Sequence, residues 1–211
     1  MNGLIICNGE IRDFSFYKKY FNKADLVICA DGAAYHMSRF GVVPHILIGD
    51  FDSITTDEYN HFLRQGVKIK KFPAEKDKTD TELAVEYALD AGCREITLIG
   101  AVGSRIDHTL SNVFLLKKIV ESGACGWIVD EKNQLTLIKK NITLVKEHNE
   151  KVSILPLSEK VEGITTKGLY YPLCNATLVH GSSRGISNEF TGVTAEITVK
   201  KGLLLVLKSS D

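Results

Sequence analysis

Residues 25–34 read DLVICADGAA, a short apolar run that ends in an aspartate and a glycine. The same arrangement recurs at residues 46–53, ILIGDFDS, and at residues 95–107, EITLIGAVGSRID. Short apolar runs that stop at turn residues are typical of strands buried in a parallel sheet. Ligands of such sheets bind outside the carboxyl ends of the strands, so the polar residues after these runs form the first candidate site.

The fold class follows from extending this pattern in both directions. Further apolar runs lie at residues 4–7, 67–72 and 127–129, and helical spacing is clearest at residues 81–91 and 107–121. Strands that alternate with helices predict an α/β domain with a mostly parallel sheet and helices on both faces.

The pattern of apolar and polar residues changes after about residue 130. Short alternating runs separated by turn residues now follow one another, at residues 135–138, 142–145, 152–155, 176–179, 195–199 and 203–207. This pattern predicts an antiparallel β-sandwich of seven or eight strands. The turn-like stretch DEKN at residues 130–133 marks the boundary, which gives domains 1–130 and 131–211.

Charge and composition exclude several classes of protein. Lys plus Arg and Asp plus Glu each total 26, so no overall basic field attracts a nucleic-acid backbone or an anionic membrane. No apolar run is long enough to span a bilayer, and the N-terminus does not resemble a signal peptide. The five cysteines form no CxxC pair, which argues against zinc and favours a reducing, cytoplasmic location.

Two carboxylates follow the run at residues 46–48. In an extended segment, Asp50 and Asp52 point to the same side, and their charges repel unless a cation joins them. Magnesium prefers oxygen ligands, so the pair predicts a magnesium site, although a solvated turn has the same composition.

Residues 76–82, KDKTDTE, open the next helix. Thr79 has the spacing of an N-cap relative to Glu82, and a helix N-terminus attracts phosphate. Lys76 adds positive charge, and Asp80 can reach the cation of the aspartate pair. The alternative is an ordinary charged helix start.

Two further strand ends carry candidate residues. Asp31 faces a ligand or caps a helix, and Gly32 permits a sharp turn and close approach. After residues 95–100, Arg105 can hold phosphate oxygens, while Asp107 can cap the helix, bind metal or accept a proton. His108 fits a polar residue at a helix start.

The second domain offers an acceptor pocket. Tyr170 or Tyr171 provides a flat stacking face, and Ser187 and Asn188 provide hydrogen bonds. A strand followed by a turn explains the same residues without a ligand.

Six motifs in this order resemble the thiamine pyrophosphokinase family: DGAA, GDFDS, KDKTDTELA, GSRIDHTLSN, GLYYPL and GISNE, from Asp31 to Glu189. The resemblance implies an enzyme that transfers diphosphate from ATP to the hydroxyl of thiamine. It implies a nucleotide- and magnesium-binding α/β domain, a sandwich domain that contributes to the thiamine site, and a homodimer with thiamine bound where subunits meet.

The resemblance also assigns roles to residues. It implies magnesium ligands at Asp50, Asp52 and Asp80. It implies nucleotide and diphosphate contacts at Asp31, Arg105 and Asp107, with Gly32, Lys76 and Thr79 in the same cleft. Catalytic roles are implied for Asp80, Arg105 and Asp107, and thiamine contacts for Ser187 and Asn188. Two positions depart from the family pattern. Ala33 replaces a usual glycine, and no tryptophan falls in the thiamine pocket, where Tyr170 or Tyr171 is the substitute.

Three other functions share parts of this pattern. A diphosphokinase for another alcohol, such as a hydroxymethylpterin, has the same acidic cleft. A non-enzymatic nucleotide-binding module binds ATP without consuming it, and a magnesium phosphohydrolase releases phosphate without an acceptor.

Overall fold

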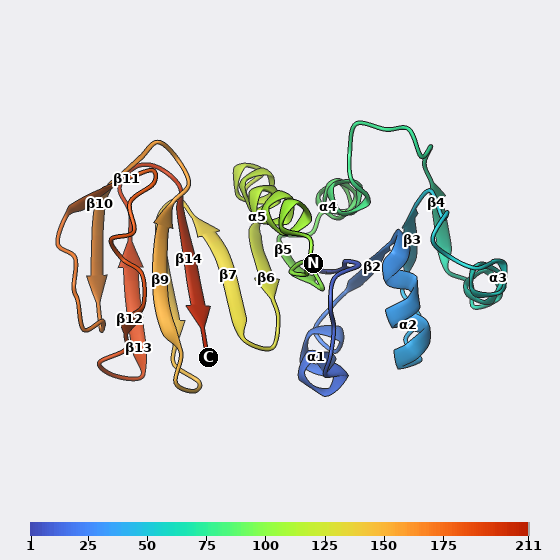
Figure 1. The fold of residues 1–211 in the computed structure, drawn as a ribbon, viewed down its shortest axis with the longest axis horizontal. Helices are drawn as coiled ribbons and strands as arrows, with labels where there is room; N and C mark the ends of the chain where they lie inside the picture. Colours follow the sequence, from blue (N-terminus) through green and yellow to red (C-terminus); the bar gives the residue numbers. More distant parts are fainter. Residues whose placement is uncertain (211) are drawn as a thin grey trace. The chain divides into compact units, whose positions relative to one another are not determined.

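The computed structural model describes residues 1–210, which divide into two compact units. The first runs from Met1 to Glu131, and the second begins at Lys132. In Figure 1 the first unit is coloured from blue to yellow-green and the second from yellow to red. Within residues 1–210, no helix combines the length and the apolar character needed to cross a membrane.

The first unit contains a parallel sheet in the order β6-β5-β1-β2-β3-β4. The strands are β1 (Asn2–Ile6), β2 (Leu26–Ala30), β3 (Ile46–Gly49), β4 (Lys68–Lys71), β5 (Glu95–Ile99) and β6 (Cys125–Val129). The helices are α1 (Phe14–Phe21), the short 3₁₀ helix η1 (Asp31–Ala33), α2 (Ala34–Phe40), α3 (Thr56–Arg64), α4 (Asp80–Asp90) and α5 (Ile106–Glu121).

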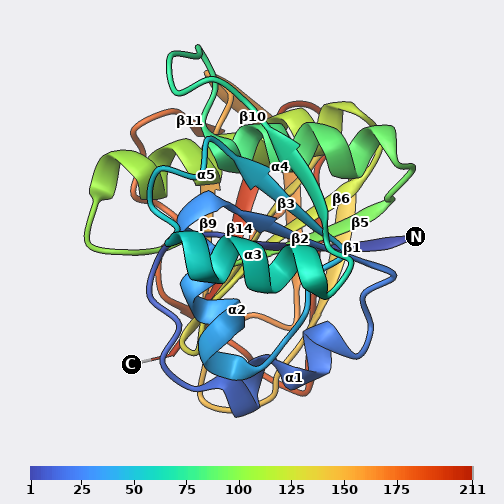
Figure 2. The same cartoon turned by 90° about the vertical axis from the view of Figure 1, so that its right-hand side faces the viewer.

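Helices cover both faces of this sheet, as Figure 2 shows. Tyr17 of α1, Met37 of α2 and Phe62 of α3 belong to one buried cluster with alternate residues of β1, β2 and β3. On the other face, α4 packs on β1, β2 and β3, and α5 packs on β6. The predicted α/β domain is therefore confirmed, because the continuous apolar strands need cover on both sides.

The strand order reverses beside β1. The chain moves outward from β1 through β2 and β3 to β4, and then returns to place β5 on the other side of β1. Backbone hydrogen bonds between the chain segments continue past the ends of β1 and β5. The Cys7 N–H donates to the Ile99 carbonyl at 2.8 Å, and the Gly9 N–H donates to the Gly100 carbonyl at 2.7 Å. Such a switch point is where open α/β sheets place their ligand crevice.

The second unit is an antiparallel sandwich, as predicted, with eight strands in its described part. One sheet has the order β12-β9-β14-β7 and the other β11-β10-β13-β8. Their bounds are β7 (Asn133–Ile138), β8 (Asn141–Val145), β9 (Lys151–Pro156), β10 (Lys160–Lys167), β11 (Ala176–Val179), β12 (Asn188–Glu189), β13 (Thr194–Thr198) and β14 (Leu204–Ser209).

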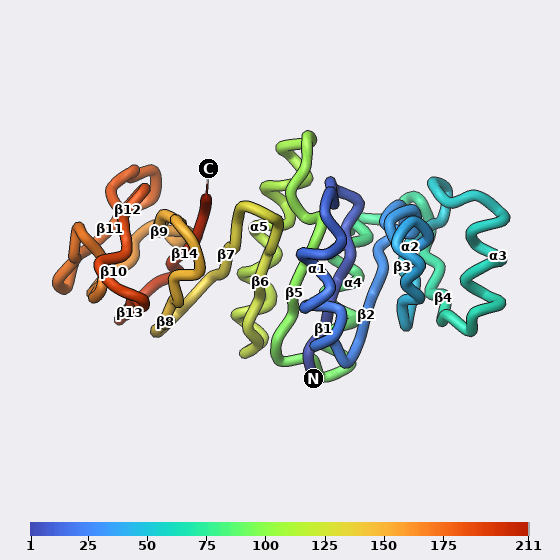
Figure 3. Tube along the Cα trace, turned by 90° about the horizontal axis from the view of Figure 1, so that it is seen from below, coloured from blue at the N-terminus to red at the C-terminus, as the bar shows by residue number. Residues whose placement is uncertain are grey.

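Apolar side chains from both sheets of the second unit form its core. Val152 and Val206 from one sheet join Ile164 and Ile197 from the other. Figure 3 shows β9, β14 and β7 running beside one another, and β10 and β11 form part of the other sheet. Alternation along β9 and β13 places every second residue in this core.

Candidate functional site

Three carboxylates gather at the carboxyl ends of β2 and β3. Oxygen atoms of Asp31, Asp50 and Asp52 all lie within 4.8 Å of one another. The Ser53 hydroxyl donates to Asp31 at 2.6 Å, and the Phe51 N–H donates to Asp31 at 3.0 Å. Asp31 makes no helix cap in this structure, because its side chain receives donors from the loop after β3.

The backbone around this carboxylate cluster is tightly constrained. A Cβ added to Gly49 would lie 2.5 Å from the Cβ of Asp31, so the end of β3 passes directly against that residue. Phe51 has φ of 65° and Asp31 has φ of 21°, both in the left-handed region that side chains rarely adopt. Strain of this kind collects where function fixes a geometry.

Mutual repulsion shapes the acidity of the cluster. Burial raises the pKa of Asp31, against the opposing Ser53 hydrogen bond, and the charges of Asp80 and Asp50 raise it further. The charge of Asp50 likewise raises the pKa of Asp52. Hydrogen bonding from the Asp52 N–H lowers the pKa of Asp50, and Lys76 adds to that effect. Excess negative charge in one place favours a bound cation.

Lys76 connects Asp50 to Asp80. Its Nζ lies 3.2 Å from Asp50 and 3.0 Å from Asp80, and its side chain is only 14% exposed. The structure thus groups Asp50 and Asp52 with Asp31, whereas the sequence grouped them with Asp80. Asp80 reaches Asp50 through the ammonium of Lys76.

Thr79 begins α4 as predicted. Its Oγ1 accepts the Glu82 N–H at 3.1 Å, which identifies it as the N-cap. The capped N-terminus of α4 opens into the same region as the carboxylates, so its free N–H groups are placed to bind an anion.

A cleft of about 780 Å³ lies at the carboxyl ends of β1, β2 and β5. The predicted residues that line it are Asp31, Gly32, Thr79, Asp80, Arg105 and His108. Gly32 packs closely on the loop after β1, since an added Cβ would meet the Asn8 side-chain nitrogen at 2.3 Å. Ala33 has φ of −70°, so the alanine in place of the family's usual glycine is tolerated, as expected.

Sequence reasoning missed the loop after β1 and His36, which also line this cleft. Asn8, Gly9 and Glu10 follow an apolar run just as the other candidate residues do. The rule that polar residues after buried strands form the site would have found this loop. No such signal marks His36, because its position depends on how α2 packs.

Arg105 and Asp107 pair with each other at the start of α5. The distance from Arg105 Nη2 to Asp107 Oδ2 is 2.6 Å, and both side chains are more than half exposed. The hydrogen bond from Arg105 lowers the pKa of Asp107 to about 2. A carboxylate of that acidity is a poor proton acceptor near neutral pH. Arg105 lines the cleft, whereas Asp107 lines a groove along α5.

The second unit arranges its candidate residues around Asn188. This buried side chain donates Nδ2 to the Tyr171 carbonyl at 2.8 Å and accepts the Tyr171 N–H at 3.0 Å. Tyr170 and Tyr171 are exposed and meet edge to face at 4.9 Å between ring centroids. A cavity of about 310 Å³ is lined by Tyr171, Ile186 and Asn188 among others.

Ser187 differs from Asn188 in its surroundings. It has φ of 57°, and its N–H donates to the Ser153 hydroxyl at 2.9 Å. Asn188 therefore holds the Tyr171 backbone in place, and Tyr171 lines the cavity. Ser187 is exposed and lies outside the described lining of that cavity.

The fold and the site together define a class of protein. An α/β unit with clustered carboxylates and a capped helix N-terminus at its strand ends is typical of enzymes that act on phosphate groups. Residues 17–125 match the sequence model described as "Thiamin pyrophosphokinase, catalytic domain". Residues 139–204 match the one described as "Thiamin pyrophosphokinase, vitamin B1 binding domain". The chain belongs to the thiamine pyrophosphokinase family.

Individual relatives agree with this assignment. A thiamine pyrophosphokinase of Bacillus subtilis is 31% identical over 194 residues, which is 91% of each chain. The crystal structure of thiamine pyrophosphokinase from the same species superposes with a TM-score of 0.89 at 30% identity and full coverage of both chains. The crystal structure from Geobacillus thermodenitrificans gives a TM-score of 0.85 at 31% identity, covering 100% of this chain and 98% of that one.

Proposed function

We propose that this chain transfers a diphosphate group from ATP to the hydroxyl of thiamine, which yields thiamine diphosphate and AMP. The family supports the reaction, and the observation that carries it is the cluster of Asp31, Asp50 and Asp52 beside the cleft of the first unit. In this proposal the first unit binds the nucleotide and the second contributes to the thiamine site.

Magnesium fits the residues of the carboxylate cluster. The donor set is three carboxylate side chains, and oxygen ligands are those that Mg²⁺ prefers. Asp31, Asp50 and Asp52 would hold the ion, which would neutralise charge on the transferred diphosphate.

The protein's own groups align the reactants. The N-terminus of α4 and Arg105 line the cleft and offer positive charge to phosphate oxygens. Lys76, which was expected in the same cleft, lies outside its described lining and adds positive charge between Asp50 and Asp80. Of the two carboxylates considered as acceptors of the hydroxyl proton, we assign Asp80. It lines the cleft, whereas Asp107 lies outside it and its pKa is about 2. Catalysis then rests mainly on positioning and charge neutralisation.

We also infer a homodimer in which the second unit of one subunit supplies the thiamine contacts to the first unit of another. Ile106, Leu110 and Phe114 form an exposed apolar stripe along α5. The same helix also carries residues that line the cleft, His108 and Asn112 among them. Apolar side chains at this spacing favour burial against a partner.

The five cysteines are free among the described residues, which supports a reducing, cytoplasmic location.

The central test replaces Asp52 by alanine. Asp52 is exposed, so the variant is expected to fold, but release of AMP in the presence of thiamine should fall on the order of a hundredfold or more. Mn²⁺ binding, followed by electron paramagnetic resonance, should weaken in parallel. Asp57→Ala, at an exposed aspartate of α3, is the matched control and should behave like the wild type.

The outcomes separate the alternative functions. A folded Asp52→Ala variant with normal AMP release would contradict the metal assignment. Release of AMP with a hydroxymethylpterin but not with thiamine would identify a different diphosphokinase. Binding of ATP without consumption would indicate a sensing module, and release of phosphate without thiamine would indicate a phosphohydrolase.

A further inference from the structure

Two buried polar side chains of the first unit have no part in the chemistry proposed above. In residues 1–131, all of which are described, the buried side chains with carboxylate, imidazole or amide groups are Asp31, His36 and Asn112. All three line the cleft. Asp31 belongs to the carboxylate cluster. Because burying a polar group is costly unless it is bonded, the partners of His36 and Asn112 indicate what these residues do.

His36 bonds to the loop after β1. Its Nε2 lies 2.9 Å from the Gly9 carbonyl, and since a carbonyl only accepts, Nε2 must carry the proton. Nδ1 is then unprotonated, and no described residue donates a hydrogen bond to it. Burial lowers the pKa of His36 against the opposing hydrogen bond to Gly9, and the nearby charge of Arg39 lowers it further, so the neutral ring is favoured. The ring also stacks on Phe40 of the same helix.

The loop held by His36 is in close contact with the loop after β5. The Gly9 N–H donates to the Gly100 carbonyl at 2.7 Å. A Cβ on Gly9 would lie 2.3 Å from that oxygen and 2.6 Å from the Val102 carbonyl, so the two backbones touch where the strand order reverses.

Asn112 fixes the second loop from the opposite side. From α5, its Nδ2 donates to the Ala101 carbonyl at 2.8 Å. One turn earlier on the helix, the Thr109 hydroxyl accepts the Gly103 N–H at 3.2 Å. A series of hydrogen bonds therefore runs from α2 through both loops to α5, across the floor of the cleft.

We propose that His36 and Asn112 are positioning residues that clamp loops 8–10 and 100–103 into a rigid floor for the nucleoside part of ATP. The inference rests on the proposed function. The phosphates belong near the carboxylates after β2 and β3, so the remainder of ATP extends toward the neighbouring strand ends, β1 and β5. A preformed floor there spares the ligand the cost of ordering two loops.

The first test compares ligands with and without a nucleoside. His36→Phe keeps a flat ring against Phe40 but loses the donor to Gly9. We expect its Kd for magnesium ATP to rise about tenfold, while its Kd for magnesium tripolyphosphate stays within about twofold of the wild type. His36→Gln can donate from a side-chain nitrogen at similar reach and should restore ATP binding to within about threefold of the wild type.

A control in the same helix separates positioning from stability. Met37→Ala removes a fully buried core side chain of α2 next to His36 in sequence. It should lower the melting temperature at least as much as His36→Phe yet leave the Kd for ATP unchanged. If Met37→Ala weakens ATP binding as much as His36→Phe does, the positioning role is wrong.

A second readout is independent of catalysis. Amide hydrogen exchange at Gly9 should become about tenfold faster in His36→Phe. In Asn112→Leu, amide exchange in the loop at residues 100–103 should become about tenfold faster. Amides of the central strand β1 should stay protected in both variants. Unchanged exchange at Gly9 in a folded His36→Phe variant would overturn the clamp. Absence of thiamine-dependent AMP release from the wild type would overturn the proposed function alone, because the exchange result stands without it.

Discussion

At the scale of single residues, the carboxylate cluster depends on the absence of one side chain. Gly49 closes β3, and the Asp31 side chain occupies the space that a Cβ at residue 49 would need. The loop after β3 can then return its N–H and hydroxyl donors to Asp31. The contact between two strand ends therefore fixes the distance between the carboxylates.

Gly49→Ala should disturb this contact. We expect a loss of about 1–3 kcal/mol in the free energy of unfolding, because backbone and Asp31 must move apart. Mn²⁺ affinity should fall with it, since one carboxylate leaves the group. Gly192→Ala is the control, because an added Cβ there meets no atom within 4 Å. Urea titration and Mn²⁺ resonance measure both effects, and wild-type Mn²⁺ affinity in Gly49→Ala would contradict the account.

Asn188 allows a residue-scale test in the second unit. Asn188→Ala leaves the Tyr171 N–H and carbonyl without their partner, which should cost about 2 kcal/mol of stability. The KM for thiamine should rise while the KM for ATP stays the same. Asn188→Asp still accepts the Tyr171 N–H but cannot donate to its carbonyl, so it should be intermediate. Equal changes in both KM values would argue against a specific role toward thiamine.

How far these residues could be predicted depends on how local their interactions are. The pairing of Asp50 with Asp52 and the cap at Thr79 follow from spacings of two and three residues. The joining of Asp31 to the pair requires β2 and β3 to be neighbours in a given register. The ion pairs of Lys76 with Asp50 and Asp80 depend on the path of the loop between β4 and α4. Hydrophobic periodicity does not predict the path of a loop.

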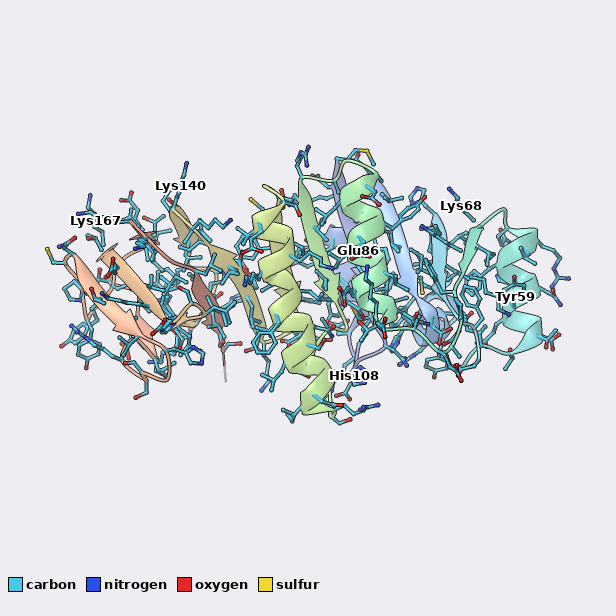
Figure 4. All side chains as sticks on the ribbon, turned by 90° about the horizontal axis from the view of Figure 1, so that it is seen from above. Tyr59, Lys68, Glu86, His108, Lys140 and Lys167 are labelled. Atoms are coloured by element: carbon cyan, nitrogen blue, oxygen red, sulfur yellow. The ribbon has the colours of Figure 1, made fainter. Side chains whose placement is uncertain are left out.

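At the scale of elements, ion pairs connect helices and strands of each unit. On the face of the first sheet shown in Figure 4, Glu86 of α4 pairs with Lys118 of α5 at 2.6 Å, and Lys118 also reaches Glu82 at 2.5 Å. These pairs join the two helices whose N-termini border the cleft. In the second unit, buried Glu150 lies 3.4 Å from buried Lys208 of β14.

The Glu150 pair predicts a dependence of stability on pH. Burial opposes ionisation of Glu150, but the His148 N–H and Lys208 outweigh it and lower its pKa below the ordinary 4.5. A carboxylate whose pKa is lowered in the folded state stabilises the protein above its ordinary pKa, and this contribution is lost as the pH falls through the folded-state pKa.

Glu150→Gln should therefore cost about 3 kcal/mol at neutral pH, because Lys208 loses its buried partner. The difference from the wild type should shrink as the solution becomes more acidic than pH 4.5. Urea unfolding at neutral and acid pH measures it. A difference that stays constant over that range would show that the charge of Glu150 does not contribute.

Elements were predicted where apolar runs were continuous and missed where they were broken. The parallel strands β2, β3 and β5 carry nearly continuous apolar runs, and the helices α4 and α5 carry helical periodicity. In β10, Gly163 interrupts the run, and the strand was not predicted from sequence. The two residues of β12 are too few to form any pattern, and they pair with β9 only in the folded unit.

At the scale of the whole molecule, the apolar stripe on α5 tests the inferred homodimer. Phe114→Asp places a charge in the stripe and should convert a dimer into monomers, as measured by sedimentation equilibrium. Leu63→Asp, at another exposed apolar residue on α3, is the control and should not change the mass. An unchanged mass in Phe114→Asp would indicate that this stripe is not the interface.

The central place of β1 in its sheet has a consequence for how the protein is made. Its residues pair with β2 nearby but also with β5, as Gly3 does with Ile96, so the middle of the sheet stays incomplete until more than ninety residues have left the ribosome. Contacts so distant along the chain slow folding and leave apolar edges open while synthesis continues. The nascent chain therefore passes through a period in which β1 has β2 as its only strand neighbour and its other edge is open to unwanted pairing.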